Sequence, residues 1–83
     1  MLRHGRAQDA VRILRLNVEQ FPHSVNALDS LAEAQVAAGD AAGARTTSEQ
    51  VLSRLGELTD VDPEFRRQLE ESARERIGAA AGP

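Results

Sequence analysis

Two breaks near the middle of the chain constrain its fold more than any other feature. The first is Pro22, which cannot continue a helix, and it is followed by Ser24, a residue type favoured at helix N-caps. The second is Gly39-Asp40, a glycine suited to the left-handed end of one helix and an aspartate suited to cap the next. Apolar residues recur at helical spacing between the two breaks. This pattern predicts a helix over residues 24–38 with a tight turn on each side.

The same signals predict three further helices. Apolar residues lie along one side of residues 6–20, with charged residues on the other side. Asp62-Pro63 is an N-cap followed by proline at the first helical position, a typical helix start. Gly56 is expected to end the third helix. We therefore expect an all-α fold of four helices at about 6–20, 24–38, 40–55 and 63–77, with a polar linker at 57–62 and a flexible small-residue tail at 78–83.

Composition excludes several classes of protein. A chain of 83 residues with 41% hydrophobic residues but only two aromatics, Phe21 and Phe65, forms one small domain with a thin core. A net charge of −3 argues against nucleic-acid binding. The absence of cysteine excludes disulfides and thiolate metal sites. No apolar run approaches the roughly 20 residues of a membrane span, and a signal-peptide core is also lacking, so no membrane association and a cytoplasmic location are expected.

The two halves of the chain repeat. Gly5-Arg6-Ala7 and Gly39-Asp40-Ala41 lie 34 residues apart, as do Ala10 and Ala44. The pairs Val18 with Leu52 and Phe21 with Leu55 keep the same offset. A 34-residue period made of a helix, a turn and a second helix is that of the tetratricopeptide repeat.

Over residues 5–56 the chain resembles tetratricopeptide repeat (TPR) proteins, with the second helix of one repeat followed by one whole repeat. In the family pattern, Leu28 takes the tryptophan position and Pro22 the closing proline. Ala10 and Ala44 take the alanine position where two helices touch most closely, so the resemblance implies that both are buried. An antiparallel helical hairpin with Gly-Asp turns from outside this family would give similar spacing.

Some residues depart from the family pattern. Gln35 replaces an aromatic residue, Ser48 an apolar residue and Gly56 the final proline, so the second half is a degenerate repeat. A narrower resemblance, over Asn17–Pro22 and Asn26–Ala34, is to the single repeat appended C-terminally to bacterial serine-hydrolase (beta-lactamase-like) domains. It implies a bacterial appendage. The chain contains no nucleophile motif of such an enzyme, so the activity does not carry over.

No group of residues has the pattern of a catalytic or metal site. His23 follows a proline in a predicted turn and fits a surface residue better than a catalytic base. Ser24 is accounted for as an N-cap. Glu70, Glu71 and Glu75 are interleaved with arginines, as on a solvated charged face. We expect a non-enzymatic chain with no catalytic residue, no metal and no cofactor.

Two functions remain open. In a TPR stack, the first helix of each repeat lines a concave face that receives a protein or peptide. The resemblance places on that face Asn26, Asp29, Glu33, Val36 and Ala37. Asp29 and Glu33 lie one turn apart and favour a basic or polar partner segment over a carboxylate, although they could equally serve only to solvate the face. The alternative function is structural: a capping or dimerisation appendage of a larger enzyme with no ligand of its own.

Self-association is predicted because the first helix is the second half of a repeat whose first half is missing. The missing helix would cover an apolar stripe of the first helix. Two arrangements could cover that stripe: the fourth helix folds back over it, or two chains pair as a symmetric homodimer through their first or fourth helices. The predicted seam residues are Ala10, Val11, Leu14, Val18, Phe65 and Leu69.

Overall fold

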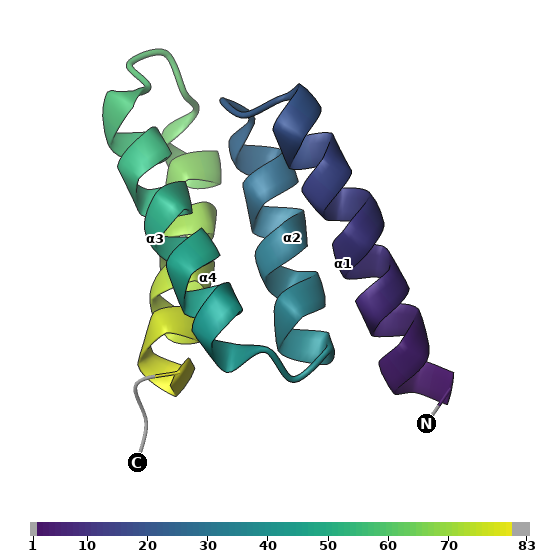
Figure 1. The fold of residues 1–83 in the computed structure, drawn as a ribbon. Helices are drawn as coiled ribbons and strands as arrows, with labels where there is room; N and C mark the ends of the chain where they lie inside the picture. The colour runs from purple at the N-terminus through teal and green to yellow at the C-terminus, as the bar shows by residue number, and fades with distance from the viewer. Residues whose placement is uncertain (1, 81–83) are drawn as a thin grey trace.

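The computed structural model describes residues 2–80, with side chains described for residues 6–79. It contains four helices, α1 (Leu2–Gln20), α2 (Val25–Ala37), α3 (Ala41–Glu57) and α4 (Pro63–Ala80), and no strand among these residues. Consecutive helices run in opposite directions (Figure 1). The all-α array of four helices expected from the sequence is confirmed.

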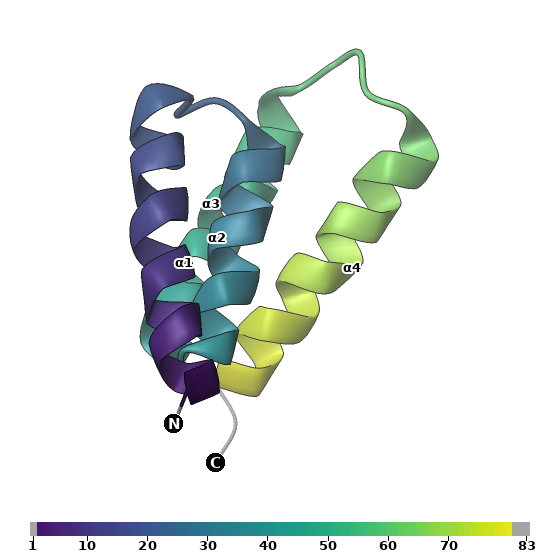
Figure 2. The same cartoon turned by 90° about the vertical axis from the view of Figure 1, so that its right-hand side faces the viewer.

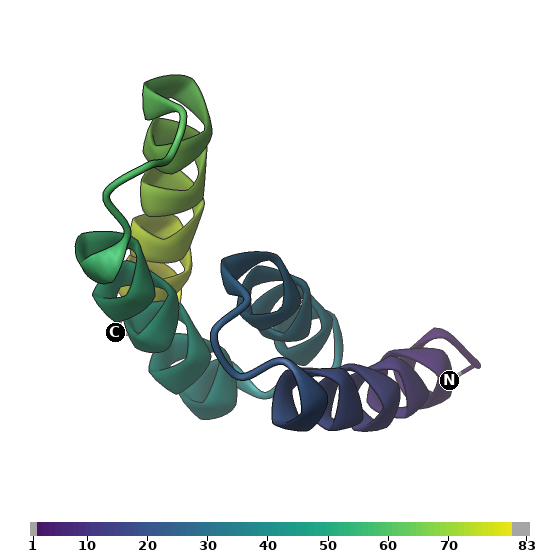
Figure 3. The same ribbon diagram turned by 90° about the horizontal axis from the view of Figure 1, so that it is seen from above.

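The helices form two layers. α1 and α3 lie in one layer and α2 and α4 in the other (Figure 3). The smallest extent of the molecule is 18 Å, which fits two layers of helices about 10 Å across. α1 packs on α2, α2 on α3 and α3 on α4, and α4 also contacts α2. Within the described residues α1 packs on neither α3 nor α4, so fold-back of the fourth helix over the first does not occur.

The predicted caps begin three of the helices. Ser24, Asp40 and Asp62 each accept a hydrogen bond from the backbone N–H three residues further on. These bonds satisfy amide groups that have no partner within the first turn of a helix. Gly39 has a φ of 82°, the left-handed conformation expected where α2 ends. The sequence thus correctly located the turns between the helices.

Two predicted boundaries are wrong. Gly56 lies inside α3, which ends at Glu57. The carbonyl of Leu55 accepts hydrogen bonds from the N–H of Leu58 and from Arg66 of α4, and Arg66 also donates to the carbonyl of Leu58. A flexible tail was expected at 78–83, but residues 78–80 continue α4, so the helix extends beyond its predicted end at residue 77. Residues 81–83 lie outside the described part of the chain.

The core lies where α2, α3 and α4 meet. Ala44 is only 1% exposed, which confirms its expected burial, whereas Ala10 is half-buried, so its expected burial is wrong. Val18 and Phe65 pack against the core from its edges. α4 slopes across the other helices and shares this core (Figure 2). The central apolar cluster consists of Val25, Leu28, Val51, Leu55, Leu69 and Ala73.

Candidate functional site

Most of the α2 face predicted to bind a partner is accessible. The exposed residues are Asn26, Glu33, Val36 and Ala37. Asp29 is different, because its carboxylate accepts a hydrogen bond from Nη2 of Arg76 on α4 at 2.5 Å. The side chains of Arg76 and Asp29 are only 10% and 19% exposed. The prediction that Asp29 is free for a basic partner is therefore wrong, since the chain supplies the cation itself.

Arg76 connects three helices through a polar cluster that it forms with Asp29 and Ser48. Its Nε donates a hydrogen bond of 2.8 Å to the hydroxyl of Ser48, which is fully buried in α3. A separate buried bond of 2.7 Å runs from the hydroxyl of Thr47 to the side-chain oxygen of Gln35. Buried polar groups are costly unless they are hydrogen-bonded. These bonds explain how the polar side chains of Ser48 and Gln35 are accommodated in buried positions.

The outward side of α4 is charged. Arg67 pairs with Glu64 and, at 2.8 Å, with Glu71. The hydrogen bond to Glu64, followed by the hydrogen bond to Glu71 and the charge of that residue, raises the pKa of Arg67 above its ordinary value. These side chains form a solvated face, as the interleaved charges predicted. No group of three or more histidine, aspartate or glutamate residues in the described part of the chain is placed to hold a metal ion.

The predicted self-association seam divides into two parts. Along α1, Ala10, Val11, Leu14 and Val18 are half-buried. On α4, Leu69 is 7% exposed inside the core and so is not accessible to a second chain, whereas Phe65 is half-buried against the core, as Val18 is. The most exposed apolar residues of α1 are Ile13, at 66%, and Leu16, at 60%. Other exposed apolar residues lie outside α1: Phe21, at 58%, in the turn that follows it, and Val36, at 52%, on α2.

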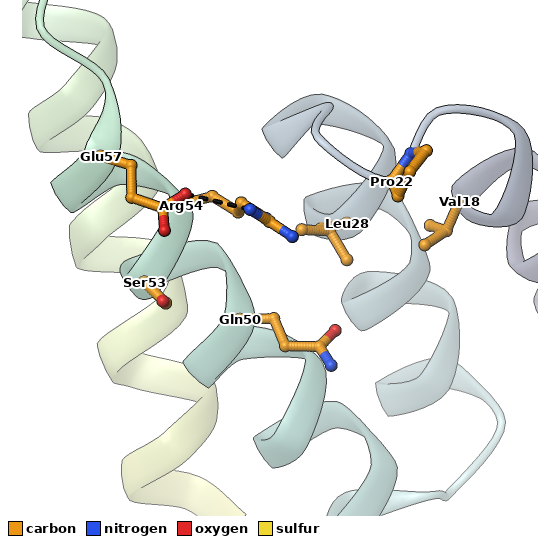
Figure 4. Close-up of a pocket in the computed structure, with 7 residues that line it drawn as sticks. All are labelled: Val18, Pro22, Leu28, Gln50, Ser53, Arg54 and Glu57. Carbon is orange, nitrogen blue, oxygen red and sulfur yellow. Dashed lines mark hydrogen bonds and ion pairs between the residues drawn. The ribbon is translucent and has the colours of Figure 1, made fainter.

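A groove of about 330 Å³ lies between α1 and α3, beside α2 (Figure 4). Figure 4 shows Gln50 and Arg54 extending from α3 toward α2. Arg54 donates a hydrogen bond of 3.0 Å to Glu57. The sequence does not reveal this groove, because its α3 wall is polar and carries no apolar periodicity. The lining residues are Val18, Pro22, Leu28, Gln50, Ser53, Arg54 and Glu57.

No protein family, curated protein sequence or solved structure matches the chain. Among the described helices, none has both the length and the apolar character needed to cross a membrane.

Proposed function

We propose that the chain is a non-catalytic protein–protein interaction module of TPR type, with the exposed side of α2 as its partner-binding face. The observation that carries this proposal is the alternating stack of helices. α1 and α3, which are related by the 34-residue repeat, lie in one layer, and α2 and α4 lie in the other (Figure 3). In a repeat stack, the helices of one layer line an extended surface for a partner.

The free groups on α2 favour a basic partner segment. Glu33 is exposed and makes no ion pair among the described residues. Asn26 lies two turns before Glu33 on the same side of the helix, while Val36 and Ala37 offer apolar contact. Arg76 already places a guanidinium against this helix, at Asp29. Glu33 is therefore the acidic group that remains available to a partner's lysine or arginine.

Selection from a displayed library of random peptides on the immobilised chain, followed by NMR mapping with the ¹⁵N-labelled protein, tests this proposal. Peptides rich in lysine or arginine should be enriched and should shift the amide signals of Glu33 and Ala37. Glu33→Gln should weaken their binding by up to about fivefold, the effect of one exposed ion pair. Glu19→Gln removes the same charge from α1 and should have no effect. Lack of enrichment, or shifts that avoid α2, would contradict the proposal.

A second candidate function is self-association as a capping or dimerisation element. The exposed Ile13 and Leu16 favour it, because α1 has only α2 as a packed neighbour within the described chain. Pairing of α1 with its copy about a two-fold axis would cover both side chains. Such an element needs no other ligand. The molar mass in solution distinguishes it from a monomeric module.

A further inference from the structure

α1 lies at one edge of the molecule with α2 as its packed neighbour (Figure 1), and its outer side carries a regular stripe. Four exposed residues follow one another at steps of four, three and four, the spacing of a coiled-coil seam: Asp9, Ile13, Leu16 and Gln20. At 100° per residue they lie within about 60° of one another around the helix. These four residues form the outer stripe of α1, and its two central members are 66% and 60% exposed.

Two opposite charges border the outer stripe on one side. Arg12 comes four residues before Leu16 and Glu19 three residues after it, so both lie within about 60° of it around α1. Both are exposed, and neither makes an ion pair among the described residues. Charges in this position beside a coiled-coil seam determine which helix pairs with it and in which direction.

The outer stripe is complementary to itself under a two-fold rotation. If a second copy of α1 lies antiparallel, with the axis midway between Ile13 and Leu16, each of these residues meets the other type in the second copy. The same rotation sets Asp9 against Gln20, whose side-chain amide can donate to the carboxylate. Every contact therefore joins two compatible groups, and every contact occurs twice.

The flanking charges match in the same register. The midpoint between Arg12 and Glu19 lies only about 1.5 Å along the helix axis from the midpoint between Ile13 and Leu16. Arg12 of each copy therefore comes beside Glu19 of the other, within reach of these long side chains. Two intermolecular ion pairs result, formed by groups that have no ion-pair partner in the described chain.

Other arrangements of two copies fit less well. A parallel pair of α1 helices would set Asp9 against Asp9 of the second copy, a like-charge contact, and would leave Arg12 about 10 Å from Glu19 along the axis. Stacking of α1 on α4 of a second copy would cover the charges around Arg67 with apolar side chains, which is costly. The antiparallel pair avoids both penalties.

We propose that α1 pairs with α1 of a second copy in this antiparallel register, with two Arg12–Glu19 ion pairs beside the Ile13–Leu16 contacts. This inference rests on the self-association given above as the second candidate function, and it adds the orientation, the register and the charges that select the partner. A seam made by one pair of helices is smaller than the roughly 1,200–2,000 Å² of a stable complex, so the dimer should dissociate on dilution.

Charge exchange tests the ion pairs. Arg12→Glu alone and Glu19→Arg alone each set like charges together, so each should weaken the homodimer by roughly tenfold in sedimentation equilibrium. An equimolar mixture of the two variants should form a heterodimer, because one chain is then acidic at both positions and the other basic at both. Both changes in one chain should restore the homodimer. Arg15→Glu is the control, since it makes the same charge change about 100° around α1 from Leu16.

Cysteine cross-linking tests the direction of the helices, and the natural chain has no cysteine to interfere. Asp9→Cys and Gln20→Cys should not cross-link as separate homodimers, because identical positions are then about 16 Å apart along the axis. A mixture of the two variants should form a disulfide under oxidising conditions, since a disulfide needs Cα atoms within about 7 Å. Circular dichroism checks that every variant keeps its helices.

Three results would overturn the proposal, and they separate it from the proposed functions. A dimer that is equally stable in Arg12→Glu, Glu19→Arg and the unaltered chain would overturn the register and leave self-association standing. A disulfide in Gln20→Cys alone would show a parallel pair. A monomer mass at every concentration would overturn both this inference and the second candidate function. Peptide binding at Glu33 of α2 is independent of all three.

Discussion

Ser48 and Arg76 show what can and cannot be predicted at single positions. That Ser48 breaks an apolar pattern is visible in the sequence, and so is the charge of Asp29. Their shared partner is not, because Arg76 lies 28 and 47 residues away from them and meets both only after α4 has packed. The resemblance placed Asp29 on a partner-binding face, but a sequence pattern fixes the side of a helix and not its neighbour, so it could not show that Arg76 pairs with this carboxylate.

The first prediction concerns the polar cluster of Arg76, Asp29 and Ser48. Asp29→Ala should lower the free energy of unfolding by about 2–3 kcal/mol, because it removes a charge-assisted hydrogen bond and leaves Arg76 without its carboxylate. Glu33→Ala, one turn further along α2 and exposed, should change it by no more than about 0.5 kcal/mol. Urea denaturation measures both. Equal effects of the two changes would show that the pair does not hold α4 in place.

Ala44 makes the second prediction. It is 1% exposed, so Ala44→Leu must force helices apart and should cost about 1–3 kcal/mol of stability. Ala42→Leu places the same side chain on the exposed side of α3 and should be nearly neutral. Thermal melts followed by circular dichroism compare the two variants. An unchanged midpoint for Ala44→Leu would refute the packing of α3.

At the scale of whole elements, local chemistry was sufficient to predict where most helices begin. Ser24, Asp40 and Asp62 cap through bonds that span only three residues, so the short-range sequence contains all that is needed. The end of α3 was mispredicted, and part of its cap comes from another helix. Arg66 donates to the carbonyl groups of Leu55 and Leu58, a contact that no local pattern reveals.

This cap makes the third prediction. Arg66→Ala should cost about 1–3 kcal/mol, because the carbonyl groups of Leu55 and Leu58 lose a charged donor and only that of Leu55 keeps a backbone donor, the N–H of Leu58. It should also speed amide hydrogen exchange in the last turn of α3. Arg67→Ala is the control, since Arg67 is exposed and pairs only with glutamates of α4. If both variants exchange at the same rate in that turn, the cap makes no contribution.

At the scale of the molecule, the two ends of the stack differ. α4 presents a charged outer side, as a terminal helix of a repeat array does, whereas α1 presents Ile13 and Leu16. The sequence predicted an uncovered α1 from the incomplete repeat. It could not predict which apolar residues stay exposed, because that depends on how α1 is rotated on α2.

The fourth prediction concerns the apolar outer side of α1. If two copies pair through α1, light scattering over a dilution series should show a dimer that dissociates as the protein is diluted. Ile13→Glu should abolish the dimer and leave the melting temperature of the monomer nearly unchanged. Val36→Glu alters a similarly exposed residue, at 52%, on α2 and should leave the dimer intact. A monomer mass at every concentration of the unaltered chain would exclude pairing.

The helices pack mainly on their neighbours in the sequence, and this arrangement determines the order in which they are expected to unfold. Because α1 rests on α2 alone, it can detach while the α2–α3–α4 core stays assembled, so the lowest-energy opening begins at the N-terminal helix. Native-state hydrogen exchange should find the amides of α1 protected less than those around Val51 and Leu55. A partner that covers α1 would suppress this opening, and slower amide hydrogen exchange confined to α1 would report its binding.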